Sequence, residues 1–445
     1  MPKKCRARGG IRCFPPGVPG KTGRIIYCDD GIVVSSAPLP KPTASDPMAA
    51  TTPSVSTVGA VSEPAVKARP RIEVIDVLRG LVMVVMLLDH VRETFFLHKQ
   101  VSDPMDVAST EPQLFLARTL AHFCAPIFVF LTGLSAWLYA NPPSGMSRPL
   151  TGFLLKRGSL LVLLEVTVIT FAWTGQFPPP TIYLQVIWVI GLCMIILGLI
   201  HSLPRGVLAA IGFGLVFGHN LLTPIDFRPA EFGYSLWTIL HDRGFLVAEG
   251  AMKVKVSYPL LPWIGIIVLG FLAGPLYGRA VEPAGRRRSL LRLGAGCLLL
   301  LLVLRGLNIY GETLPWRQGE DAIRTVMSFF NYTKYPPSLD FALMTLGVGF
   351  LLLAWLEPVR NGVTRALADL GGAPMFYYIL HLYVLLALQT IMVSVVGPTH
   401  GSRFGIDHFG GIWVIWLAMI VPLYYPVRAF ARFKRRTNQA WVRYF

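Results

Sequence analysis

The sequence predicts an all-α, polytopic membrane protein with about ten transmembrane helices and both termini in the cytoplasm. Of its 445 residues, 53% are hydrophobic and only 15% are charged, whereas a soluble domain carries about a quarter charged residues. Apolar stretches long enough to cross a bilayer follow one another after residue 70. Lysine and arginine crowd the connections that lie on one side of these stretches, and this asymmetry sets the topology.

The first 70 residues are rich in Pro, Ser, Thr, Ala and Gly and show no hydrophobic periodicity. Such a composition cannot bury a core, so we expect a disordered tail over residues 1–70. No secretory signal sequence is visible, and the first span is expected to act as the membrane signal itself. Met48 is an alternative start of the chain. A transmembrane domain over residues 71–430 and a basic cytoplasmic tail over residues 431–445 complete the predicted organisation.

The transmembrane domain is expected to contain one helix for each apolar stretch. The predicted spans cover residues 72–97, 114–140, 152–173, 181–201, 204–222, 259–278, 289–310, 338–357, 372–397 and 411–430. Proline and glycine interrupt several of them, which neighbouring helices tolerate by closing around the freed backbone groups.

The chain is basic, with 41 Lys and Arg against 24 Asp and Glu and a net charge of +17. In a soluble protein this balance would indicate nucleic acid. Here the excess lies in the tails and short loops, where it sorts the loops to the cytoplasm and contacts anionic lipid. An even number of spans follows, with Arg79 near the cytoplasmic leaflet and His90 in the outer half. The long outer segment 222–258 is expected to form a lid or an acceptor platform.

The first span carries four ionisable residues: Asp76, Arg79, Asp89 and His90. Each costs roughly 3 kcal/mol on insertion, so such groups face a bundle interior. Arg79 and His90 are eleven positions apart, which on a helix returns them to within about 20° of one another and separates them by about 16 Å. They therefore line one channel. Alternatively, Asp76 and Arg79 neutralise each other and His90 bonds to a neighbouring helix carbonyl.

Arg79 followed by ten residues and His90 resembles the arginine and histidine signature of the membrane acyltransferase-3 superfamily. The segments IDVLRGLVMVVMLLDH and HFCAPIFVFLTGLSAWLYA are similar to the heparan-α-glucosaminide N-acetyltransferase catalytic-domain family. The segments 184–200, 261–274 and 331–347 agree with it, and the resemblance covers residues 71–428. It implies transfer of an acyl group, in the first place acetyl, from cytoplasmic acyl-CoA to a hydroxyl or amine. The acceptor is expected to be a glycan or a lipid-linked sugar at the outer face.

His90 is the candidate catalytic residue. Imidazole titrates near neutrality, so it can remove a proton from the acceptor, or it can become acylated as a nucleophile. The sequence leaves both roles open. Asp89 is adjacent in sequence, so it points about 100° away from His90 and is a poor partner for orienting it. A pantetheine arm is about long enough to carry a thioester from Arg79 to His90.

Other residues are expected to support the base, to hold acyl-CoA or to line the acceptor side. His381 resembles the histidine of the Tyr-x-x-His motif of acyltransferase-3 proteins, or it is a hydrogen-bonded core residue. Lys334 and Tyr335 lie at an outer helix entrance, where Lys334 meets a polar acceptor or anchors in lipid headgroups. The remaining candidates are His122 at a helix start and Glu165 as a partner of Arg305 or of a histidine. His219 faces the outer acceptor side or caps a helix end. Lys156 and Arg157 face coenzyme A phosphates or are sorted to the inside by charge.

None of the six cysteines forms a C-x-x-C or a Cys/His ligand spacing, so neither a metal site nor a disulfide framework is predicted. The predicted partners are the bilayer, acyl-CoA and a glycan or lipid acceptor, with homo-oligomers as a further option and without nucleic acid. The expected location is the plasma (inner) membrane. A transporter or flippase that uses the same buried charges is the rival function, and a non-catalytic membrane scaffold is a third.

Overall fold

The computed structural model describes residues 73–142, 145–437, 439 and 441–442, together with the strands β1 (Arg24–Cys28) and β2 (Gly31–Ser35). These two strands form an antiparallel pair in a unit of their own, residues 1–67. The other residues of the predicted disordered tail lie outside the described part of the chain. That prediction is therefore untested.

The second unit, residues 68–445, holds the helices, and the described chain is mostly helical, with 67% helix and 4% strand. Its first half contains α1 (Glu73–Phe95), α2 (Pro112–His122), α3 (Cys124–Ala140), α4 (Thr151–Leu164), the π-helix η1 (Glu165–Ile169), α5 (Thr170–Thr174), β3 (Thr181–Leu184), α6 (Val186–Ile200), α7 (Arg205–Gly218) and η2 (His219–Leu222). Its second half contains α8 (Tyr234–Leu240), β4 (Gly244–Val247), β5 (Lys253–Val256), α9 (Leu261–Ala273), η3 (Gly274–Tyr277), α10 (Pro283–Gly306), α11 (Ala322–Phe329), α12 (Leu339–Leu356), α13 (Gly362–Gly371), α14 (Pro374–Val395) and α15 (Phe409–Arg436).

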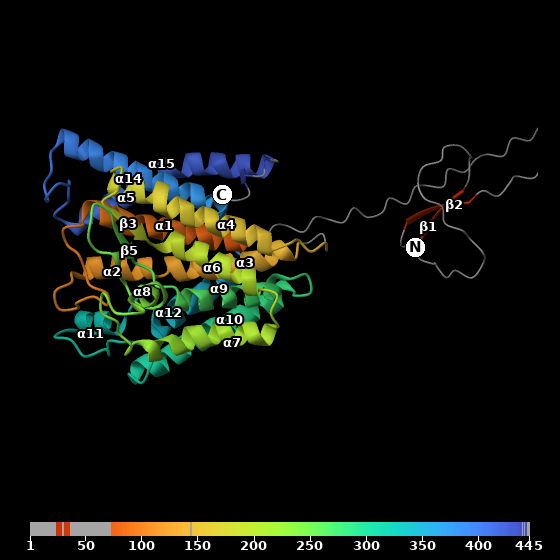
Figure 1. The fold of residues 1–445 in the computed structure, drawn as a ribbon, viewed down its shortest axis with the longest axis horizontal. Coiled ribbons are helices and arrows are strands. Elements are labelled where there is room, and N and C mark those ends of the chain that lie inside the picture. The colour runs from red at the N-terminus through yellow and green to blue at the C-terminus, as the bar shows by residue number, and fades with distance from the viewer. Residues whose placement is uncertain are drawn as a thin grey trace, which may run out of the picture. The chain divides into compact units, whose positions relative to one another are not determined.

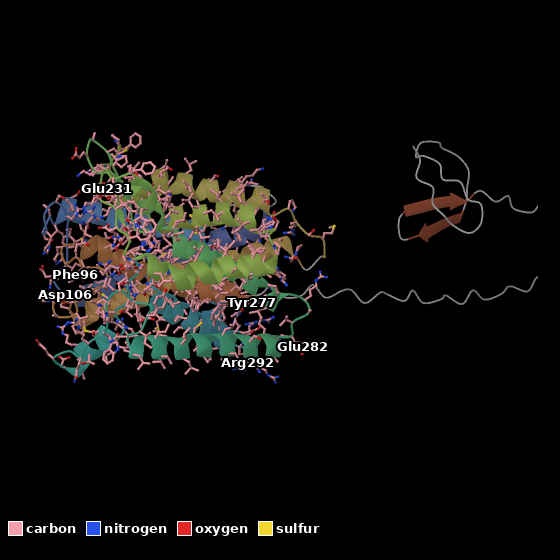
Figure 2. All side chains as sticks on the ribbon, turned by 60° about the horizontal axis from the view of Figure 1, so that its bottom comes forward. Phe96, Asp106, Glu231, Tyr277, Glu282 and Arg292 are labelled. Atoms are coloured by element: carbon pink, nitrogen blue, oxygen red, sulfur yellow. The ribbon has the colours of Figure 1, made fainter. Side chains whose placement is uncertain are left out.

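The long helices run side by side in one bundle, and the connections between them gather at its two ends (Figure 1). We call one the loop end, formed by segments 97–111, 175–185, 223–260, 307–338 and 396–408. The other is the basic end, formed by segments 141–142, 145–150, 201–204, 278–282 and 357–361. Figure 2 shows Phe96, Asp106 and Glu231 toward the loop end, and Tyr277 and Glu282 toward the basic end.

Helix α1 begins and helix α15 ends at the basic end, joined there through the short helix α13 and the turn before it. Arg360 Nε lies 3.8 Å from a carboxylate oxygen of Glu73, and Asp369 pairs with Arg428 at 3.3 Å and with Arg435 at 3.0 Å. The first and the last residues of the helical bundle thus lie at the same end. Helix α15 continues to Arg436, so the predicted boundary at residue 430 falls inside a helix.

Each predicted apolar span contains a helix, although several spans are interrupted. The span 114–140 breaks at Phe123 into α2 and α3, and the span 152–173 passes through the π-helix η1. Among the described residues, six helices are long and apolar enough to cross a membrane: 112–140, 205–222, 283–306, 339–356, 374–395 and 409–436. The count of about ten transmembrane helices stays a prediction.

Helix α1 lies inside the bundle, where it packs against α3, α12, α13, α14 and α15. Its contact with α13 depends on glycine. A methylene at Gly80 would lie 2.0 Å from the carbonyl oxygen of Leu367, and one at Gly371 would lie 1.9 Å from that of Asp76. Backbones approach this closely only where small residues meet. The charged first span is therefore held at the centre of the fold.

The fold is mostly helical, in agreement with the predicted all-α class, and it also contains a small sheet. Strands β3, β5 and β4 form a small sheet at the loop end, with β5 between β3 in parallel and β4 in antiparallel orientation. The outer segment 222–258, which we expected to form a lid or platform, supplies α8, β4 and β5. Strand β5 leads directly to Tyr258, which lines the cavity described below.

Candidate functional site

Two buried histidines meet between α1 and α14. His90 is 9% exposed and His381 is not exposed at all. Their rings are stacked with centroids 4.9 Å apart, and His90 Nδ1 lies 2.6 Å from His381 Nε2. The structure thus brings together the two histidines that the sequence singled out separately, 291 positions apart.

The hydrogen bonds around this pair define where its protons lie. His381 Nδ1 is 2.7 Å from the carbonyl oxygen of Tyr377. A carbonyl only accepts, so His381 Nδ1 carries the proton and, in the neutral ring, His381 Nε2 accepts. The proton between the rings then belongs to His90 Nδ1. Neutral His90 is left with its lone pair on Nε2, which is the form required of a general base or a nucleophile.

Aromatic side chains enclose the histidine pair. Trp173 from α5 meets the His90 ring edge-on with centroids 5.1 Å apart, and Tyr378 from α14 does so at 5.7 Å. Tyr378 also packs against His381 at 5.5 Å. Rings on three sides restrict the orientation of the His90 imidazole. The residue three positions before His381 is thus part of the site, as in the predicted Tyr-x-x-His motif.

A cavity of about 870 Å³, counted to its opening, adjoins His90. Its walls are mostly apolar and come from α1, the α2–α3 pair, α4, α6 and α14, with residues such as Met86, Phe128 and Ile190. Its polar lining includes His90, Asp89, Thr132, Arg157, Tyr258 and Lys334. Within the described part of the chain, His381 is not among the lining residues, so it supports His90 from behind.

Asp89 is held by arginines rather than by His90. Its carboxylate accepts hydrogen bonds from Arg92 Nε at 3.0 Å and from Arg118 at 3.2 Å. This agrees with the expectation that Asp89 points away from its neighbour on a straight helix. Two cations balance one buried carboxylate, and Glu93 pairs with Arg92 at 2.9 Å. The part of the cavity wall that Asp89 forms is therefore polar, but the charge of the carboxylate is balanced by the arginines.

Lys334 closes the cavity at the loop end. Its side chain is buried, with the ammonium 5.1 Å from the Tyr335 ring centroid and 5.9 Å from that of Tyr258. Burial alone would lower the pKa of Lys334, but interactions with Tyr335 and Asp89 outweigh it and raise that pKa above its usual value. The alternative of a lipid-headgroup anchor is therefore wrong, because the charge faces the protein interior.

Asp103 holds the backbone of this loop. Its carboxylate accepts from the amides of Lys334 at 3.2 Å and of Tyr335 at 2.9 Å. Burial raises the pKa of Asp103. The Tyr335 hydroxyl donates to that of Tyr258 at 3.2 Å. Lys334 and Tyr335 are thus fixed in place from two sides.

A second hollow, which we call the vestibule, opens at the basic end. It holds about 2300 Å³ counted to its opening, and it is lined by Asp76, Arg79, Ser135, Arg279 and Arg286, with Trp137 and Tyr277 among others. Arg79 donates to Asp76 at 3.0 Å, to the carbonyl of Leu131 at 3.3 Å and to the Ser135 hydroxyl. Asp76 and Arg79 do form the expected pair, yet both still face an open space.

Three other predicted residues, Lys156, His122 and His219, do not line the His90 cavity. Lys156 is exposed and lines neither hollow, whereas Arg157 next to it lines the cavity. His122 is buried with its ring against Phe341, and its Nδ1 has no hydrogen-bond partner among the described residues. His219 Nδ1 contacts the carbonyls of Leu215 and Val216, in agreement with a helix-end role.

The predicted pairing of Glu165 with Arg305 or a histidine is wrong. Glu165 is fully buried in the π-helix η1 and accepts from the backbone amide of Trp188 at 2.9 Å. Arg305 instead donates to the carbonyls of Leu314, Ser328, Phe329 and Asn331. Glu165 therefore joins η1 to the start of α6.

The sequence did not single out Asp103, Arg118, Trp173, Tyr258 or Tyr377. Arg118 has one usable signal, because a charge inside an apolar span requires a partner. Tyr377 acts through its backbone carbonyl, and the other three through packing or loop geometry. For these four, no sequence pattern indicates a role.

The profile of the family described as heparan-alpha-glucosaminide N-acetyltransferase, catalytic, matches residues 71–310, more than half of the chain. The chain belongs to this family. The match includes Arg79, His90 and Arg157 and ends before Lys334 and His381. No curated protein matches the chain. A heparan-alpha-glucosaminide N-acetyltransferase catalytic domain implies a transferase, and the family in general uses acetyl-CoA as donor. Placement in the acyltransferase-3 superfamily stays a prediction.

Proposed function

We propose that this protein is a membrane-embedded acyltransferase that moves an acetyl group from acetyl-CoA to a hydroxyl or amine acceptor, with His90 as the reacting base or nucleophile. The observation that carries this proposal is the hydrogen-bond chain from Tyr377 through His381 to His90. It leaves the His90 lone pair on Nε2, in a residue that lines a largely apolar cavity. A histidine that served only in packing would require neither this series of hydrogen bonds nor an adjoining cavity.

The vestibule is the proposed entrance of the donor. Arg79, Arg279 and Arg286 line it, and arginine forks bind phosphate oxygens in two-point contacts. Arg286 also donates to Glu357 at 2.8 Å and covers the Tyr277 ring at 4.9 Å, so part of the wall is rigid. These residues suit the phosphates of coenzyme A. Lys156, which is exposed, is left out of this set.

In the proposed reaction the acceptor heteroatom attacks the thioester carbonyl carbon while its proton passes to His90 Nε2. The C–S bond then breaks, and the coenzyme A thiolate takes up the proton from His90. If His90 is itself the nucleophile, the acetyl group resides on Nε2 before the acceptor removes it. Lys334 supplies positive charge at the cavity wall in either case.

The acceptor is proposed to be a glycan or a lipid-linked sugar that reaches the cavity from the loop end. In this arrangement both termini and the basic end lie in the cytoplasm, and the protein is in the plasma (inner) membrane. Arginines concentrated in the helix turns that adjoin the basic end, such as Arg286, Arg287 and Arg288 at the start of α10 and Arg435 and Arg436 at the end of α15, support this orientation. Reporter fusions at Arg286 and at residue 240 should read inside and outside respectively. The opposite result would put the vestibule on the side that lacks acyl-CoA.

The experiment that tests the function uses purified full-length protein with acetyl-CoA labelled in the acetyl group. Transfer of label to a sugar acceptor, or to the protein with release of coenzyme A, supports the enzyme. Flux of an unmodified solute across vesicles without release of coenzyme A supports the rival transporter or flippase. The absence of both activities, in protein whose donor binding is intact, would favour a scaffold.

A further inference from the structure

Three side chains with metal-binding atoms meet on the loop end, away from the His90 cavity. His98 follows α1, and His400 and Asp407 lie in the connection between α14 and α15. One ligand atom from each lies within 4.8 Å of the other two. No other group of three such residues comes this close among those the structure describes. The three come from segments about 300 residues apart, so sequence spacing gave no hint of them.

The two segments are fixed to each other. The amide of Ile406 donates to the carbonyl of Phe95 at 2.8 Å, and Thr399 bridges the loop by bonding the amide of Gly405 at 2.8 Å. A methylene at Gly405 would lie 2.8 Å from His400 Nδ1 and 3.1 Å from His98 Nδ1. The glycine therefore allows both rings to converge on the loop backbone.

Within the cluster, a histidine contacts the aspartate and stacks on the second histidine. His400 Nε2 is 3.1 Å from Asp407 Oδ1, while the rings of His98 and His400 stack with centroids 3.8 Å apart. Neutral imidazole is the metal-binding form.

We propose that His98, His400 and Asp407 bind a divalent transition-metal ion, for which Zn²⁺ is the best match. Zinc takes two imidazoles and a carboxylate and completes its shell with water. Ligand atoms of a tetrahedral zinc ion lie about 3.3 Å apart, given bonds of about 2.0 Å. The His400 to Asp407 distance already fits this, and the wider pairs close by rotation of exposed side chains.

Two nearby cations do not block this site. Lys99 pairs with Glu111 at 2.6 Å, so its charge is largely neutralised. Arg403 lines the same hollow as His98 and His400, and its backbone pairs with that of His400. Its presence weakens the attraction for a cation, which favours moderate affinity.

The metal would join the α14–α15 connection to the end of α1 without touching the reacting groups. Thr94, which lines the same hollow, donates to the carbonyl of His90 at 2.8 Å. Binding is therefore expected to stabilise the helix that carries His90. This inference does not rest on the proposed function, because it concerns metal binding and stability alone.

The test titrates ZnCl₂ into the purified, metal-stripped full chain without a histidine tag, followed by calorimetry and thermal unfolding. Wild-type protein should bind Zn²⁺ at this site and gain melting temperature. His98→Ala and Asp407→Asn should each weaken that binding about tenfold or more, since even partners of metal ligands contribute this much. Both side chains are exposed, so their loss should leave the fold intact.

The matched control is His408→Ala, which removes an exposed histidine next to Asp407 that does not belong to the cluster. It should bind and be stabilised like wild type. Cys5, Cys13 and Cys28 are present in every variant, so their contribution to zinc binding is the same in each measurement. Equal binding by His98→Ala and wild type, or no binding by wild type at millimolar zinc, would overturn the proposal.

Discussion

The His90 cavity and the basic-end vestibule both border helix α1, but they hold their polar groups in different ways. In the cavity, His90 is buried and its proton position follows from a chain of hydrogen bonds ending at a backbone carbonyl. In the vestibule, Arg79 and Arg286 are partly exposed and paired with Asp76 and Glu357. One region fixes the state of a single imidazole, and the other presents several permanent charges to an open space.

This difference suggests that the cavity carries out the chemical step and that the vestibule binds the donor. A fixed tautomer matters for proton transfer but adds little to affinity, whereas arginine forks bind phosphates in the ground state and the transition state alike. Changes in the cavity should therefore lower kcat, and changes in the vestibule should raise KM for the donor. The following predictions test that division, beginning with the largest expected effect.

His90→Ala and His90→Gln should both abolish transfer while acetyl-CoA still binds. Glutamine keeps a hydrogen-bonding side chain of similar size but cannot act as a base near neutral pH. General base catalysis contributes about 10²- to 10⁴-fold, and loss of a nucleophile would cost at least as much. Turnover, donor binding and melting temperature should be measured together for both variants.

A packing histidine predicts another pattern for the same pair. His90→Gln would then retain activity, and His90→Ala would lower the melting temperature by leaving the buried His381 nitrogen without its partner. An active His90→Gln protein would refute catalysis by His90.

His381 is expected to act as a positioning residue for His90. His381→Phe removes the acceptor of His90 Nδ1–H, so His90 loses its fixed tautomer and kcat should fall by about 10- to 100-fold. His381→Gln keeps an oxygen that can accept this proton and should recover most of the rate. The pH dependence of kcat should change in His381→Phe and stay close to wild type in His381→Gln. Equal loss in both variants with an unchanged pH profile would indicate a purely structural histidine.

Much of this arrangement was predictable, because local patterns carry it. Each apolar stretch predicts a helix, and the structure places a helix in each. The prediction that Arg79 and His90 line one channel is not confirmed, because Arg79 lines the vestibule and His90 lines the cavity. The sequence also predicts that residues 72–97 span the membrane, but helix α1 is not among the six described helices that are long and apolar enough to do so, so that span stays a prediction. Here the buried charges themselves indicated an interior helix.

The partners across the bundle were not predictable. The contact between His90 and His381 depends on how α1 packs against α14, and Lys334 enters the cavity only because Asp103 holds its loop. Opposite charge alone suggested that Glu165 pairs with Arg305, yet four carbonyls satisfy Arg305. The small sheet escaped notice because its strands are only four residues long and β3 pairs in parallel with a distant segment.

Arg79→Lys tests the vestibule. Lysine keeps the charge but loses the planar fork, so insertion should be normal while KM for acetyl-CoA rises about 5- to 10-fold with little change in kcat. The matched control is Arg287→Lys, because Arg287 is exposed and lines neither hollow. It should leave KM unchanged. If Arg79→Lys binds coenzyme A normally, then Arg79 serves only to join Asp76, Leu131 and Ser135.

The smallest expected effect is the change in melting temperature caused by Lys334→Met. This variant tests whether a charge in the cavity wall contributes to the stability of the fold. Asp89 keeps Arg92 and Arg118 in this variant, so it does not become an unpaired buried carboxylate. The loss is then mainly the interaction of the ammonium with the rings of Tyr258 and Tyr335. Such contacts contribute about 1 kcal/mol, so the melting temperature should fall only slightly.

The pH dependence gives this prediction its sign. The pKa of Lys334 is raised above its ordinary value of 10.5 in the folded protein. Its contribution to stability is therefore fully present below pH 10.5 and is lost as the pH rises through the folded pKa. The difference in melting temperature between wild type and Lys334→Met should stay constant from about pH 7 to pH 9 and shrink above that ordinary value. Lys99→Met, which removes an exposed lysine, should show almost no difference at any pH. If the difference in melting temperature between wild type and Lys334→Met grew with rising pH, the charge of Lys334 would destabilise the fold, and this prediction would be wrong.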